Sequence, residues 1–242
     1  MFLHIRGEII GVEPVNCQYN RPRLYLPSHF NETRLEVLRA LMRARPLSTL
    51  VTQCESGLVA NHLPVQTLDE PAPLGCIRGH VARANPLWRE YREGTQALAI
   101  FQGPHAYISP SLYPSKEKTG EVVPTWNYAV VHAGGTLRFI EDAAWLRAFV
   151  AGLTALHEAP RSAPWKIDDA PAPFIERNLR MIVGFELSIT ALTGKWKMSQ
   201  NRIRADRDGV VRGLGDAGDA DSREIAGIVA ALDAAPESPP TQ

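Results

Sequence analysis

The stretch FQGPHAYISPSLYPSKEKTGEVVPTWNYAVVH, residues 101–132, decides the fold. Two apolar segments flank a polar run, and they carry Tyr107, Tyr113, Trp126 and Tyr128 together with two histidines. Aromatic rings beside a few polar groups suit a pocket for a flat ligand with polar edges. The same pattern suits two core strands joined by a loop, with their aromatic side chains packed inward. Both interpretations stay open on the residues alone.

Composition limits the classes of protein to which the chain can belong. Its 242 residues suffice for one large domain or two small ones, and its hydrophobic content of 45% is ordinary for a globular protein. A formal net charge of zero gives little support for a dedicated nucleic-acid binder. Five basic residues nevertheless stand from Lys195 to Arg207, ahead of an acidic tail. A solvated basic turn and an anion site both fit that segment.

The sequence shows no membrane or secretion signal. No apolar run is long enough to span a bilayer, and Glu8, Glu13 and Asn16 interrupt the region where a signal peptide has its apolar block. A cytoplasmic protein with no membrane partner is therefore expected. Three cysteines without a CxxC pair favour reduced thiols, and no metal site is expected.

Hydrophobic periodicity predicts a mainly β fold with appended helices. The expected helices cover residues 31–46, 85–93, 142–158 and 174–181, with one or two more near the C-terminus. The expected strands cover residues 47–53, 58–68, 75–82, 95–102, 106–109, 126–140 and 183–191, with a bulge at Gly134-Gly135. Most of these strands are joined as hairpins, which favours an antiparallel barrel with helices packed on it.

Two groups of residues are candidates for chemistry. Four histidines fall in or beside expected strands and could together ring one end of a barrel: His62, His80, His105 and His132. His80 and Arg83 also stand directly before a helix start at Asn85-Pro86, where a guanidinium and free backbone N–H groups could bind an anion. An ordinary surface arginine beside a capped helix fits the same residues.

Several motifs occur in an order that resembles the PaiB family of FMN-binding negative transcriptional regulators. They are TLVT, NHLPV, GHVARANPLWRE, the stretch from FQGPHAY to TWNY, IVGFEL and GKWKMSQNR, and the resemblance runs from Leu24 to about Leu232. It implies an antiparallel, Greek-key-like FMN-binding split barrel, similar to pyridoxamine phosphate oxidase and flavin reductases. It also implies a homodimer with FMN at the subunit interface.

The resemblance implies a set of cofactor-binding residues and no catalytic residue. The phosphate of FMN would be held near the second and third strands and the following helix start, at His62, His80, Arg83 and Asn85, with Thr52 lining the same site. Four further motif residues would lie near the pocket or the dimer seam: Trp126, Lys197, Gln200 and Asn201.

Two departures from the family pattern affect the organisation of the chain. Leu112 stands where the family usually has tryptophan, and the family usually begins near Leu24. Residues 1–23 are therefore expected to form an extension outside the core. The expected division is this extension, a split-barrel FMN-binding domain at residues 24–193, and a basic loop with a helical segment at residues 194–242.

Three functions are compatible with these residues. The first is a flavin-binding protein that regulates transcription negatively, acting on DNA or through a transcription partner. The second is an FMN-dependent oxidoreductase such as a flavin reductase. The third is a split barrel without flavin that binds haem or another small ligand through the strand histidines.

Overall fold

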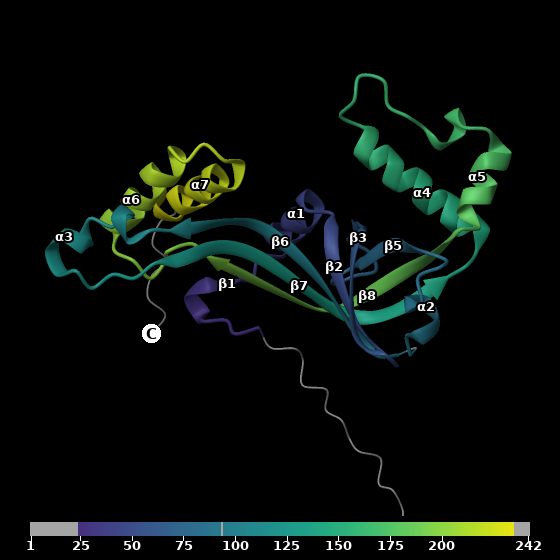
Figure 1. The fold of residues 1–242 in the computed structure, drawn as a ribbon, viewed down its shortest axis with the longest axis horizontal. Helices are drawn as coiled ribbons and strands as arrows, with labels where there is room; N and C mark the ends of the chain where they lie inside the picture. The colour runs from purple at the N-terminus through teal and green to yellow at the C-terminus, as the bar shows by residue number, and fades with distance from the viewer. Residues whose placement is uncertain (1–23, 93, 235–242) are drawn as a thin grey trace, which may run out of the picture.

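A curved antiparallel sheet forms the middle of the molecule, with helices at both of its ends (Figure 1). The computed structural model describes residues 24–92 and 94–234, so the expected extension at residues 1–23 lies outside the described residues. One end of the sheet carries α6 (Arg204–Gly215) and α7 (Ala220–Ala234). The other end carries α4 (Ala143–Glu158) and α5 (Ala172–Leu179).

The remaining elements precede these helices or form the sheet itself. The strands are β1 (Asn31–Glu32), β2 (Leu47–Cys54), β3 (Gly57–Pro64), β4 (Gln66–Leu68), β5 (Cys76–Ala82), β6 (Gln96–Ile108), β7 (Thr125–Ile140) and β8 (Ile182–Lys197). The other helices are α1 (Leu35–Ala44), α2 (Leu87–Glu90) and α3 (Ser115–Thr119). Short 3-10 turns occupy Ser28–Phe30, Pro110–Leu112 and Ile167–Asp169.

The sheet has the antiparallel, barrel-like arrangement that the sequence predicts. Its strand order is β3-β2-β6-β7-β8-β5-β4, β1 pairs with β8, and every pairing is antiparallel. Because β3 also contacts β5, the sheet curls round on itself. The predicted hairpin is confirmed by the pairing of β2 with β3.

The interior of the barrel is a close-packed apolar core. Leu50, Phe101, Phe185 and Leu187 are at most 1% exposed, and burial of one such side chain contributes about 1.5–3 kcal/mol. Gly79 of β5 makes room for one of these rings, since a Cβ atom there would lie 2.3 Å from the Phe185 ring. Two smaller clusters attach the end helices, one beneath α6 and α7 and one beneath α4 and α5.

Several element boundaries differ from the sequence-based expectation. The strands expected at residues 95–102 and 106–109 are one strand, β6, with an irregularity between Gln102 and His105. The bulge expected at Gly134-Gly135 is confirmed, and a Cβ atom at Gly135 would lie 2.0 Å from the Ser188 carbonyl oxygen. The helix expected from residue 31 begins only at Leu35, because residues 31–32 pair with β8.

The last strand is longer than expected. It continues past residue 191 to Lys197, because residues 192–197 pair with β7. The expected domain boundary between residues 193 and 194 therefore falls inside β8, and two lysines assigned to a basic loop lie on a strand. Across residues 24–92 and 94–234, no helix has the length and apolar character needed to cross a bilayer.

Candidate functional site

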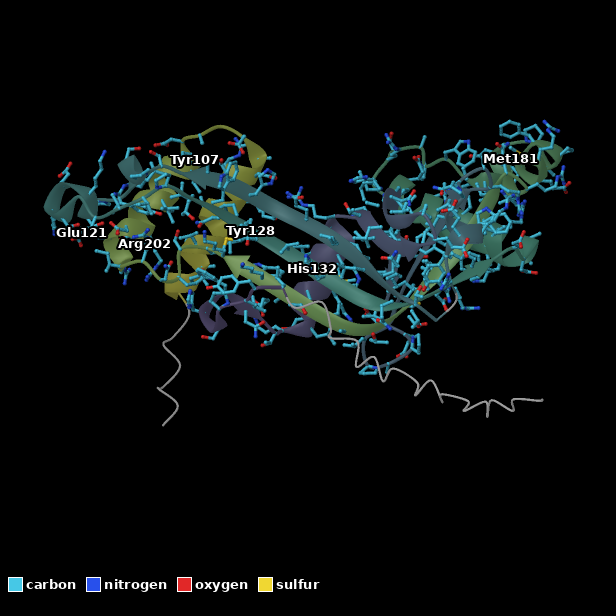
Figure 2. The ribbon with its side chains drawn as sticks, turned by 60° about the horizontal axis from the view of Figure 1, so that its bottom comes forward. Tyr107, Glu121, Tyr128, His132, Met181 and Arg202 are labelled. Carbon is cyan, nitrogen blue, oxygen red and sulfur yellow. The ribbon has the colours of Figure 1, made fainter. Side chains whose placement is uncertain are left out.

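One face of β7 presents a row of side chains away from the packed core. Asn127, Ala129 and Val131 are buried, whereas the alternating positions Trp126 and Tyr128 are exposed or half-buried. Successive side chains of a strand point to opposite faces, so positions 126, 128, 130 and 132 share the outer face. Figure 2 shows Tyr128 and His132 along the middle of the sheet.

Pairing with the neighbouring strands extends this row into a surface. Trp126 lies opposite Tyr107 of β6, and Tyr128 lies between His105 of β6 and Lys197 of β8. The next outer position, Val130, lies between Gln102 and Lys195. Side chains directly opposite each other in an antiparallel pair are close neighbours on one face. The outer face of β6, β7 and β8 therefore gathers aromatic, imidazole and ammonium groups.

A hollow of about 530 Å³ opens on this surface, and we call it the outer-face hollow. Its wall is mostly apolar and aromatic, with a few polar side chains, which is the usual make-up of a small-ligand site. Its lining residues come from β6, β7 and the start of the described chain: Leu24, Gln102, His105, Trp126, Tyr128, Ala129, Val130 and His132.

The rings at the hollow hold one another in place. The Trp126 ring lies 5.9 Å from the His105 ring, and the Tyr107 ring meets it edge-on at 5.8 Å. On the other side, the Lys195 ammonium lies 5.5 Å from the centre of the Tyr128 ring. Trp126 and Tyr107 are each 51% exposed, so about half of this aromatic surface is available for contact with another molecule.

Burial shifts the protonation of two groups at the hollow. Burial lowers the pKa of His132, so its neutral imidazole is favoured. Burial also lowers the pKa of Lys197, and the nearby cations Lys195 and Arg202 add to the effect. The hollow thus has a neutral imidazole along its wall and an ammonium group at its rim that is costly to keep charged.

Among the residues predicted for the cofactor site, Trp126 lines the hollow and Lys197 borders it. His62 lies on the same outer face, in a cross-strand row with Thr49, Ile100 and His132. Three strand spacings of about 4.8 Å separate His62 from His132, which places His62 outside the lining of the hollow.

Thr52 does not line the outer-face hollow. Its side chain is 1% exposed and faces the barrel interior. Its hydroxyl donates to the Val59 carbonyl oxygen at 3.5 Å. The outer face of β2 belongs instead to the alternating residues Thr49 and Val51. A displacement by one residue along a strand moves a side chain to the opposite face of the sheet.

Arg83 lies away from the hollow, and its guanidinium is already bound within the chain. Nε donates to the Arg180 carbonyl oxygen at 2.8 Å, and Nη2 donates to the Ile182 carbonyl oxygen at 3.2 Å. Nη1 pairs with a Glu141 carboxylate oxygen at 2.5 Å. The structure therefore uses this arginine to join the end of β5 to the start of β8, and it does not support the predicted role in binding phosphate.

His80 is also separated from the hollow. Its imidazole meets the Phe149 ring of α4 edge-on at 5.9 Å, and burial lowers its pKa. The Asn85 side chain caps α2 as predicted, because its oxygen accepts a hydrogen bond from the Leu87 N–H at 2.9 Å. However, α2 has only four residues, which weakens the expectation of an anion site at its start.

Gln200 and Asn201 belong to the turn that joins β8 to α6. Gln200 closes this turn by accepting from the Met198 N–H at 2.7 Å and donating to the Trp196 carbonyl oxygen at 2.5 Å. Ser199 in the same turn has a φ of 62° and bonds to the buried Asn127 side chain. Gln200 thus has a structural role, while Asn201 is exposed and lines no described hollow.

The prediction omitted several residues that the structure places at the hollow. Gln102, Tyr128 and Lys195 are the main ones. The alternation of residues 126, 128, 130 and 132 indicates that Tyr128 shares a face with Trp126 once the strand is known. Lys195 could be placed beside Tyr128 only with the true length of β8. Gln102 could be placed opposite Val130 only with the register between β6 and β7.

Comparisons with known proteins identify the family. The family described as "Putative FMN-binding domain" matches residues 24–191. Over 206 residues the chain is 31% identical to the Bacillus subtilis "Protease synthase and sporulation protein PAI 2", covering 85% of this chain and 96% of the relative. It is 33% identical over 241 residues to an uncharacterized protein of Emericella nidulans, with the same coverages.

Solved structures share the fold at low identity. The "FAD and Heme binding protein from Mycobacterium smegmatis" has a TM-score of 0.51 at 17% identity, covering 69% of this chain and 73% of that one. A conserved hypothetical protein of Mycobacterium tuberculosis has a TM-score of 0.50 at 10% identity, covering 74% and 92%. The fold is the split β-barrel of the pyridoxamine phosphate oxidase type, and the chain belongs to the PaiB-type FMN-binding domain family.

Proposed function

We propose that this protein binds a flavin, FMN, with the ring system in the outer-face hollow. The observation that carries the proposal is the hollow itself, where Trp126 and Tyr128 stand beside His105 and Gln102 on the outer face of the barrel. Membership of an FMN-binding domain family supports the choice of ligand.

The residues present fit a flavin. Ligand sites usually measure about 300–1,000 Å³, and the outer-face hollow of about 530 Å³ falls within this range. Aromatic side chains offer contact to the faces of a flat ring, while Gln102 and His105 offer hydrogen bonds to its polar edge. Any redox chemistry would be supplied by the flavin, and the chain would bind and orient it.

We further propose that two copies of the chain meet across this outer face. Trp126 and Tyr107 expose half of their surface there, and the hollow lies on an open sheet face rather than deep inside the barrel. A second copy would cover these rings and close the hollow, as a symmetric homodimer does with one shared patch. The flavin would then lie at the subunit boundary.

The biological role that we favour is negative regulation of transcription, in which the flavin acts as ligand or sensor. The name of the Bacillus subtilis relative, which refers to protease synthesis and sporulation, is compatible with this role. The zero net charge favours action through a transcription partner over direct binding to DNA. A cytoplasmic location fits such a role and stays a prediction. An FMN-dependent oxidoreductase would use the same site.

A haem-binding protein is the second candidate. Two histidines, His105 and His132, line the hollow, and imidazole is a common axial ligand of haem iron. A protein of the same fold is named as binding both FAD and haem. Among residues 24–92 and 94–234, no three His, Cys, Asp or Glu side chains form a metal-binding group.

The absorbance spectrum of the protein purified without added cofactor tests these proposals. We expect the two visible bands of an oxidised flavin, or their appearance after FMN is added and the excess is removed. A Soret band would favour haem. If neither group is retained and FMN fluorescence is unaffected by the protein, the flavin proposal is wrong. Oxidation of NADH or NADPH by the FMN-loaded protein would favour the oxidoreductase.

A further inference from the structure

A second hollow, of about 520 Å³, opens beside the turn that joins β4 to β5, and we call it the turn hollow. Its volume falls within the usual range of about 300–1,000 Å³ for small-ligand sites. It shares no lining residue with the outer-face hollow, because it is lined by Leu68, Asp69, Glu70, Pro71 and Arg78. The turn hollow thus combines one guanidinium and two carboxylates with apolar side chains.

Arg78 of β5 is held in place from two sides. Its Nε donates to a Glu186 carboxylate oxygen at 2.7 Å, and its guanidinium lies 5.7 Å from the centre of the Trp145 ring of α4. Arg138 of β7 donates to the other oxygen of Glu186, from Nε at 3.1 Å and from Nη2 at 2.9 Å. Because two arginines share one carboxylate, this group keeps an excess of positive charge.

The guanidinium of Arg78 still has free hydrogen-bond donors. Across residues 24–92 and 94–234, its two Nη groups have no acceptor, whereas Arg83 uses Nε and both Nη groups within the chain. The Arg78 side chain is 36% exposed and lines the turn hollow. A guanidinium presents its N–H groups as a fixed fork that matches a carboxylate. Arg78 is therefore an oriented donor to which an external carboxylate can bind.

The negative charge at the turn hollow comes from Asp69 and Glu70. Asp69 pairs with Arg39 Nε at 3.2 Å and with Arg43, which offsets its charge. Glu70 accepts a hydrogen bond from the Ala72 N–H at 2.8 Å through Oε2. In the part of the chain that the structure describes, Glu70 forms no ion pair within 4.0 Å. Glu70 is thus the carboxylate that remains available to a cation.

We propose that the turn hollow binds a free α-amino acid with an apolar side chain. The carboxylate of the ligand pairs with the Nη groups of Arg78, and its ammonium group pairs with Glu70. Leu68 and Pro71 contact its apolar side chain. A simple carboxylate would bring a second negative charge close to Glu70, and a simple amine would bring a second positive charge close to Arg78. A zwitterion meets an opposite charge at both positions.

Other parts of the chain hold the charged groups of the turn hollow in position. Arg39 and Arg43 of α1 fix the turn through Asp69, and Glu186 fixes Arg78. A site whose groups are already ordered loses less conformational freedom when a ligand binds. The inference goes beyond the proposed function, since it concerns a separate hollow and a different ligand, and it does not depend on flavin binding.

Thermal unfolding with added L-leucine, and with no flavin in the sample, tests the proposal. A ligand that binds only the folded state stabilises it, so the melting temperature should rise with L-leucine concentration in a saturable way. Isocaproate is L-leucine without the amino group, and isoamylamine is L-leucine without the carboxylate. Each analogue should bind at least about tenfold more weakly than L-leucine, as expected for the loss of a charge-assisted hydrogen bond.

Substitutions at the two charged positions locate the site. Arg78→Gln and Glu70→Gln should each weaken L-leucine binding by about tenfold or more. Arg138→Gln is the matched control, because it also removes a partner of Glu186 but lies outside the lining of the turn hollow. It should leave the affinity for L-leucine unchanged even where it lowers stability. Glu70 is exposed on the turn, so Glu70→Gln serves if Arg78→Gln folds poorly.

The outcomes separate this site from the flavin site. Absence of a saturable rise with L-leucine would overturn the proposal, and so would equal binding of isocaproate or isoamylamine. Unchanged affinity in Glu70→Gln, or the same loss in Arg138→Gln as in Arg78→Gln, would also overturn it. Flavin binding is measured in separate samples, so failure of either proposal leaves the other standing.

Discussion

His105 of β6 and Asp221 of α7 are joined across the edge of the outer-face hollow. The His105 Nδ1 atom lies 3.1 Å from an Asp221 carboxylate oxygen, and the His105 backbone N–H donates to the same oxygen at 3.3 Å. The family match ends at residue 191, so α7 lies beyond it. A residue that lines the hollow is thus held by a helix outside the matched region.

This contact predicts energetic coupling between the C-terminal helix and the barrel. In a double-mutant cycle, His105→Ala and Asp221→Ala should show a coupling energy of roughly 0.2–1 kcal/mol, the usual range for a partly exposed pair. Urea unfolding of the four proteins measures it. Additive effects of the two substitutions would show that the contact contributes nothing to stability.

Two glycines at the α4 end of the sheet should respond oppositely to alanine. A Cβ atom at Gly184 would lie 2.3 Å from the Trp145 ring, so Gly184→Ala should destabilise the protein by about 1–3 kcal/mol. Gly152 lies inside α4 with nothing within 4 Å of such an atom, so Gly152→Ala should stabilise it by roughly 0.5–1 kcal/mol. Thermal unfolding measures both. Equal effects would contradict the packing of Trp145 over β8.

His80 should make stability depend on pH. Burial lowers its pKa, so on acidification the unfolded chain takes up a proton at about pH 6.5 while the folded protein takes it up only at lower pH. Stability contributed by the neutral imidazole is therefore lost as the pH falls below about 6.5. His80→Phe should reduce the drop in melting temperature between about pH 7.5 and about pH 5.5. His157→Gln, at an exposed position, is the control variant and should leave this drop unchanged. An unchanged drop in His80→Phe would refute this role.

Association through the outer face predicts which exposed aromatic residue matters. Multi-angle light scattering at micromolar concentration should give the mass of a dimer, and Trp126→Glu should shift it toward monomer. Met181→Glu is the matched control, because Met181 is 63% exposed but lies at the other end of the molecule, near α5 (Figure 2). A monomer for the unmutated protein, or equal effects of the two variants, would contradict a dimer built on this face.

The barrel was predictable because its signals are local. Turn residues separate the apolar segments that form β2, β3 and β5, and paired glycines mark the bulge in β7. The length of β8 was not predictable from the sequence, because Thr193, Lys195 and Lys197 are polar or charged residues of the kind found in loops. On the strand they alternate with Gly194 and Trp196, and only the pairing with β7 explains their position.

The site was less predictable because it depends on register and on distant partners. The sequence predicts Thr52 at the cofactor site, but the segment has β-branched residues at both parities, and pairing with β3 and β6 decides which of them face outward. Arg83 resembles an anion-binding residue in sequence, yet its partners are carbonyls about a hundred residues further along the chain. Trp126 and Lys197 were found because they belong to conspicuous motifs.

The position of the flavin ring is tested most directly by a substitution that fills the hollow. His132 lines the hollow from the middle of β7, and His62 occupies the same outer face outside it (Figure 2 labels His132). We expect His132→Trp to abolish binding of both FMN and riboflavin in a fluorescence titration, because the indole would occupy the space of the ring. His62→Trp should bind both flavins as the unmutated protein does. Normal binding by His132→Trp, with loss of binding in His62→Trp, would contradict a flavin in the outer-face hollow.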